Sequence, residues 1–75
     1  YKKAAELANS LVFRANYNLG SMYVFAKNFN EAAPRLRLAV QAAPENFEAQ
    51  YNLGFALEGV GQDAEALKAF EAASR

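Results

Sequence analysis

The chain has 75 residues with eight basic and eight acidic side chains, so its formal net charge is zero. It contains no Cys, His or Trp, which excludes a disulfide framework, a cysteine-based zinc site and catalysis by Cys or His. The neutral balance argues against binding to nucleic acid or to an anionic membrane, and no apolar run approaches the roughly 20 residues of a membrane span.

The remaining composition favours helices. The chain has 17 Ala and 8 Leu but only 4 Val, and it has neither Ile nor Thr. Ala and Leu are strong helix formers, whereas strands depend on β-branched side chains. We therefore expect an all-α protein.

The first two predicted helices cover residues 1–9 and 13–26. In the second of them, Leu19, Met22 and Tyr23 lie at three- and four-residue spacing, which places them on one face of a helix.

A third helix is predicted over residues 30–42. It follows a turn in which Glu31 lies three residues after Asn28, the spacing of a capping box. Pro44 ends it, because proline cannot continue a helix. Pro34 lies inside it, and we expect this residue to cost one hydrogen bond without ending the helix.

The last two predicted helices cover residues 47–59 and 63–74. Asn46 is a favourable N-cap for the first of these, and Asp63 is the predicted N-cap of the second. Gly61 lies in the break between them. The pattern therefore predicts about five helices.

An internal repeat runs through the chain. Residues 13–20 recur as residues 47–54 at an offset of 34, with six of eight residues identical. Over 13–41 and 47–75, nine of 29 positions are identical. A fixed period of this size indicates a helical repeat in which each unit packs on its neighbours.

The two-helix unit of 34 residues resembles the tetratricopeptide repeat. The residues that match the family pattern are Leu19, Gly20, Tyr23, Ala32 and Pro44 in the first unit, and Leu53, Gly54, Ala66 and Phe70 in the second. Asn16 and Gln50 stand where the family pattern has Trp. The resemblance covers residues 13–75.

This resemblance implies a right-handed superhelical array of antiparallel helix-turn-helix hairpins. Residues 1–12 would be the second helix of a preceding partial repeat with its linker, and 13–46 would be one repeat. Residues 47–75 would be a second repeat without its C-terminal end and capping helix. Because no neighbour covers that end, we expect Leu67 and Phe70 to expose apolar area, through which copies of the chain could associate.

In the family, the first helix of each repeat lines a concave groove that binds an extended peptide or a helix of a partner. The groove positions carried over are Arg14, Tyr17, Asn18, Ser21, Val24 and Phe25, followed by Glu48, Tyr51, Asn52, Phe55 and Glu58. The equivalent residues Asn18 and Asn52 can pair with a peptide backbone or simply be solvated. The aromatic side chains are either interface anchors or partly buried packing residues.

The sequence predicts a scaffold module for protein–protein interaction, and the alternative is an oligomerisation unit that stacks through its open repeat ends. The family's clamp for acidic chaperone tails is not matched, because Tyr17 and Ser21, or Tyr51 and Phe55, replace its Lys and Asn. We expect no catalytic activity, cofactor, metal, nucleic acid or membrane partner. The absence of Cys fits the cytoplasm, which is the default expectation, and the periplasm alike.

Overall fold

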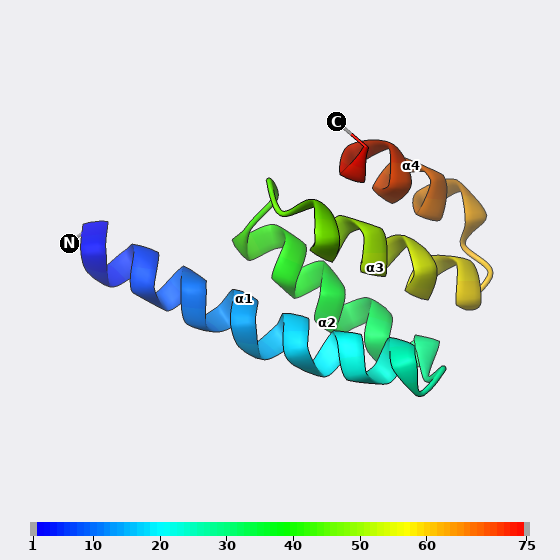
Figure 1. Ribbon diagram of the computed structural model, residues 1–75, viewed down its shortest axis with the longest axis horizontal. Coiled ribbons are helices and arrows are strands. Elements are labelled where there is room, and N and C mark those ends of the chain that lie inside the picture. The colour runs from blue at the N-terminus through cyan, green and yellow to red at the C-terminus, as the bar shows by residue number, and fades with distance from the viewer. Residues whose placement is uncertain (1, 75) are drawn as a thin grey trace.

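The computed structural model describes the backbone of residues 2–74 and the side chains of residues 10–74. This part of the chain contains four α-helices and no strand. They are α1 (Lys2–Phe25), α2 (Phe29–Ala42), α3 (Phe47–Gly59) and α4 (Asp63–Ala73). Each helix runs antiparallel to the one before it (Figure 1). The all-α prediction is confirmed.

Helix α1 is longer than the sequence predicted, so the described residues form four helices rather than about five. The segments 1–9 and 13–26 join into one helix, apart from residue 1, which lies outside the described residues, and Ala26, which lies in the turn after the helix. Asn9 and Ser10 lie at the junction, and each lowers helix propensity by only a few tenths to ~0.7 kcal/mol. Residues 1–12 contain neither Gly nor Pro, so no residue at the junction stops the helix. The assignment of residues 1–12 to a preceding repeat stays a prediction.

The turns α1–α2 and α3–α4 have the same backbone geometry. Lys27 has φ 64° and Gly61 has φ 85°, so both lie in the left-handed region. The amide that follows Lys27 donates to the Tyr23 carbonyl at 2.7 Å, and the amide that follows Gly61 donates to the Leu57 carbonyl at 2.8 Å. These bonds define a Schellman motif at each helix end. The 34-residue repeat therefore extends to the turns, although their sequences differ.

The helix starts agree only in part with the sequence. Asn46 caps α3 as predicted, and its side chain accepts a hydrogen bond from the Ala49 amide at 3.0 Å. Asn28 is the N-cap of α2, but its side chain makes no cap bond. The N-cap of α4 is Gln62, so the prediction of Asp63 at that position is wrong. Asp63 is the first helical residue, where its carboxylate is favourable near the positive end of the helix dipole.

Small residues let the helices of each hairpin approach closely. A Cβ at Gly20 would lie 2.5 Å from Cγ of Leu36, and a Cβ at Gly54 would lie 2.5 Å from Cε1 of Phe70. The buried core around them is mostly Ala, with Leu36 and Leu57 as its largest fully buried side chains. Each hairpin therefore closes on a glycine that matches the repeat pattern.

The apolar surface at the C-terminal helix is smaller than expected. Leu67 is exposed, but Phe70 is only partly exposed because its ring packs against Gly54 and the core. Helix α2 continues through Pro34 to Ala42, as predicted.

Candidate functional site

Helices α1 and α3 carry all eleven predicted groove residues, and a chain of hydrogen bonds joins the two helices. The Tyr17 hydroxyl donates to Oε2 of Glu48 at 3.2 Å. Nδ2 of Asn52 donates to Oγ of Ser21 at 3.3 Å and to the Tyr17 hydroxyl at 3.5 Å. The structure therefore brings together four residues that the sequence placed in one groove.

A hollow of about 320 Å³ lies over this chain. It is lined by Tyr17, Phe47, Glu48, Tyr51 and Asn52. Sequence reasoning identified all of these except Phe47. The signal for Phe47 was present, because it begins the second copy of the repeated segment as Phe13 begins the first.

The two equivalent asparagines have different surroundings. Both N–H groups of the Asn52 amide are directed to residues of α1, which leaves its Oδ1 as the free acceptor. Asn18 is exposed, and none of the hydrogen bonds found among the described side chains involves it. Asn18 thus offers both a donor and an acceptor, whereas Asn52 offers an acceptor only.

Further aromatic rings pack against Tyr51 and Tyr17, two of the side chains that line the hollow. Tyr51, Phe55 and Phe70 form a cluster with edge-to-face contacts, at centroid distances of 4.8, 5.5 and 5.6 Å. Phe13 stacks on Tyr17 at 5.3 Å. Edge-to-face and stacked rings hold one another in place, so they form a rigid apolar border.

The remaining predicted groove residues are less closely associated with the hollow. Arg14 and Glu58 are exposed, and Val24 packs against the core. Phe25 is exposed at the end of α1 and is the repeat equivalent of Gly59, which faces Phe29 of α2. Phe25 therefore corresponds to the contact between α2 and α3 rather than to the groove.

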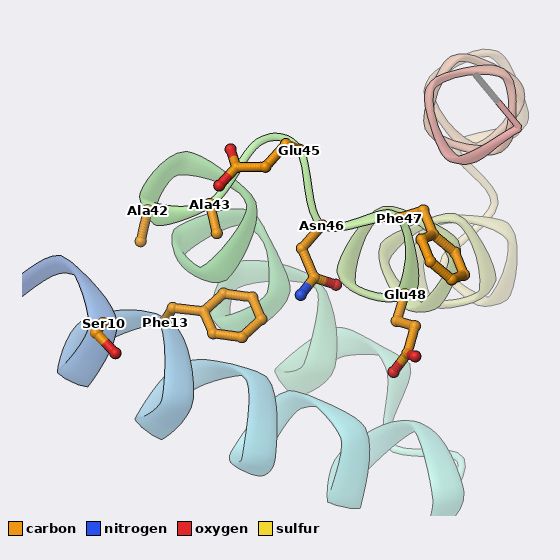
Figure 2. Close-up of a pocket in the computed structure, with 8 residues that line it drawn as sticks. All are labelled: Ser10, Phe13, Ala42, Ala43, Glu45, Asn46, Phe47 and Glu48. Atoms are coloured by element: carbon orange, nitrogen blue, oxygen red, sulfur yellow. The ribbon is translucent and has the colours of Figure 1, made fainter. Parts of the chain in front are cut away.

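A larger cleft of about 590 Å³ lies between α1 and the turn from α2 to α3 (Figure 2). Its lining residues are Ser10, Phe13, Ala42, Ala43, Glu45, Asn46, Phe47 and Glu48. Figure 2 shows the Phe13 ring pointing from α1 toward Asn46. The sequence analysis missed this cleft because it placed a helix break close to Ser10.

Comparison with protein-family profiles gives a match. The profile of the family described as tetratricopeptide repeat matches residues 25–75, which is more than half of the chain. The chain belongs to the tetratricopeptide repeat family. No curated protein matches it.

Tetratricopeptide repeats generally mediate protein–protein interaction, so the match supports a protein-interaction scaffold. No helix of the described residues is both long and apolar enough to cross a membrane. Within the same part of the chain, no group of three or more acidic side chains could hold a metal ion.

The amides at the family's Trp positions are accommodated by hydrogen bonds. Nδ2 of Asn16 donates to the Val12 carbonyl at 2.9 Å, and Nη1 of Arg35 donates to Oδ1 of Asn16 at 3.4 Å. Nε2 of Gln50 donates to the Pro44 carbonyl at 3.3 Å. Both amides are half-buried, and these bonds replace the water they would otherwise bind.

Proposed function

We propose that the groove between α1 and α3 binds an extended segment of a partner protein. In this proposal the two hairpins form part of a right-handed superhelix whose concave side is the groove. The observation that carries it is the hollow at Tyr17, Glu48 and Asn52, where a free amide oxygen lies beside aromatic rings. In typical peptide-binding sites, polar groups orient the backbone of the peptide and neighbouring aromatic rings contact its side chains.

The residues of the hollow define the class of ligand. Tyr51 and Phe47 are exposed, and the free oxygen of Asn52 would accept from a peptide N–H whatever the side chain. Glu48 is the one charged residue that lines the hollow, so a strongly acidic segment would be repelled. An apolar or aromatic segment without acidic residues fits best, and the acidic tail of a chaperone does not.

We propose no catalytic role for this chain. A general base or nucleophile would have to come from Glu, Asp, Lys, Tyr or Ser, because His and Cys are absent. The only acidic residue of the hollow, Glu48, accepts a hydrogen bond from Tyr17 and is exposed.

The proposal can be tested with a phage-displayed library of random peptides, selected on the intact chain. The affinity of a selected peptide is then measured by fluorescence anisotropy for three variants. Asn52→Ala should weaken it about tenfold, the effect of losing about one hydrogen bond of ~1.4 kcal/mol. Asn18→Ala should also weaken it, whereas the matched control Asn30→Ala, on α2, should not.

Thermal melts followed by circular dichroism separate binding from folding. The proposal requires that Asn18→Ala melts like the parent chain, because its side chain is exposed. Unchanged affinity in both Asn18→Ala and Asn52→Ala would contradict the groove as the binding site.

A further inference from the structure

The amide of Asn52 could face the groove in either of two orientations. Its side chain is half-buried on α3, and its Nδ2 lies 3.5 Å from the Tyr17 hydroxyl and 3.3 Å from Oγ of Ser21, both on α1. A carboxamide keeps nearly the same shape when its oxygen and nitrogen exchange places. Packing alone therefore does not decide which of the two atoms faces α1 and which faces the groove.

Glu48 decides the orientation through Tyr17. A carboxylate has only acceptor atoms, so the hydrogen bond of 3.2 Å between the Tyr17 hydroxyl and Oε2 of Glu48 uses the hydroxyl proton. Because a hydroxyl carries one proton, the Tyr17 oxygen can act toward Asn52 only as an acceptor. It pairs with the N–H side of the Asn52 amide and repels the oxygen side.

Ser21 adds a hydrogen bond to Asn52 but sets no direction. Its hydroxyl can accept from an amide N–H or donate to an amide oxygen, so it fits Asn52 in both orientations. Tyr17 differs because its proton is already used by Glu48. The direction of the Asn52 amide thus depends on Glu48 and Tyr17 and not on Ser21.

An amide oxygen that faces the groove selects the backbone that a partner can present. An extended segment makes no internal backbone hydrogen bonds, so its N–H groups are free to donate. In the interior of a helix each N–H is already bonded to the carbonyl four residues earlier, whereas each carbonyl keeps a second lone pair. An outward nitrogen could therefore bind the backbone on the side of a helix, but an outward oxygen could not.

We propose that Glu48 and Tyr17 are positioning residues that hold the Asn52 oxygen toward the groove. The groove then accepts a backbone N–H of an extended partner segment rather than the side of a helix. The ligand rests on the function proposed above, whereas the direction of the amide is a property of the free chain. The two parts can therefore be tested separately.

Nuclear Overhauser effects in the free chain report the direction of the amide. In the parent chain, the Nδ2 protons of Asn52 should show strong effects to the ring protons of Tyr17. Tyr17→Phe keeps the ring but removes the hydroxyl, and Glu48→Gln replaces an acceptor-only group by one that can also donate. Both variants should reduce these effects to about half, because the amide then samples both orientations.

Ser21→Ala is the matched control for the free chain. It also removes one hydrogen bond to Asn52, but it leaves Tyr17 and Glu48 in place, so the effects to the Tyr17 ring should be unchanged. Effects of equal strength in the parent chain and in Tyr17→Phe would overturn the proposal, because the direction would not depend on the hydroxyl.

Backbone esters test the ligand. In a peptide selected on the intact chain, each amide in turn is replaced by an ester, which removes the N–H and keeps the side chains. One ester should lower the affinity for the parent chain about tenfold, the effect of about one hydrogen bond, and should have no effect in Asn52→Ala. That amide should lie beyond the fourth residue of the peptide, because a helix leaves only its first four N–H groups free.

The same ester separates the positioning residues from Ser21. Its effect should fall to about twofold in Tyr17→Phe and Glu48→Gln, because the freed Asn52 amide can turn its N–H toward the ester oxygen, and should stay about tenfold in Ser21→Ala. The ratio of ester to amide affinity within one variant cancels any general effect of the substitution on folding or charge.

The outcomes distinguish the two proposals. An undiminished ester effect in Tyr17→Phe would overturn the positioning role even if the groove binds the peptide. If no ester effect depends on Asn52 while the free chain behaves as expected, the groove fails as the binding site and the direction of the amide stands.

Discussion

Lys27 and Gly61 occupy the same left-handed position at the ends of α1 and α3, yet only one of them is glycine. An L-residue in this region costs about 1–2 kcal/mol because its Cβ crowds the backbone. Glycine avoids that cost but loses about 0.4–1 kcal/mol through the greater freedom of the unfolded chain. We therefore expect Lys27→Gly to raise the free energy of unfolding by about 0.5–1 kcal/mol. The reverse change, Gly61→Ala, should lower it by a similar amount, and no neighbouring atom lies within 4 Å to add a steric effect.

The measurement is thermal unfolding followed by circular dichroism at 222 nm, which reports helix loss. In a chain of this size 1 kcal/mol corresponds to a shift of about 4–8 °C in Tm, so Lys27→Gly should raise Tm by about 2–8 °C. Lys27→Ala is the control, because it removes the ammonium group but keeps the Cβ. If Lys27→Ala stabilises the chain as much as Lys27→Gly, the gain comes from the lost charge and the conformational argument is refuted.

Three further predictions concern stability and can be checked by urea or thermal unfolding. Asn46→Ala should lower the free energy of unfolding by about 1 kcal/mol, whereas Asn28→Ala should cost clearly less because its side chain makes no cap bond; equal losses would contradict this. Gly54→Ala should destabilise the chain by about 1 kcal/mol, because an overpacking cost of about 1–3 kcal/mol exceeds a helix-propensity gain of about 1 kcal/mol; a stabilised variant would show that the Phe70 ring moves freely. Arg37→Ala should cost less than about 1 kcal/mol, and the difference should shrink in 1 M NaCl; a larger, salt-independent loss would mean that its packing matters more than its charge.

Local signals in the sequence were sufficient for most of the helices. An N-cap and a proline act on the backbone next to them. Asn46 and Pro44 therefore located the boundary between α2 and α3 correctly. The join within α1 was missed because Asn9 and Ser10 are weaker helix formers than their neighbours, although neither of them stops a helix. The start of α4 was misplaced by one residue because Asp is favourable both at the N-cap and in the first turn of a helix, and here Asp63 takes the first-turn position.

Long-range packing decided which side chains of the site meet. The resemblance to the tetratricopeptide repeat put Tyr17, Ser21, Glu48 and Asn52 in one groove, and these four side chains are joined by hydrogen bonds. The resemblance did not show that the Asn52 amide donates hydrogen bonds to α1, whereas Asn18 donates none to the described residues. That difference exists because Asn52 has a preceding first helix beside it, whereas Asn18 has none among the described residues.

The sequence alone therefore determined an all-α protein with a 34-residue repeat, because composition and period can be read without knowing which helices are neighbours. Only the tertiary structure decided which equivalent residues differ in burial, since that depends on which neighbouring helix is present. Leu19 and Leu53 are identical in the sequence, yet one is exposed and the other is buried. No pattern within a single repeat contains that difference.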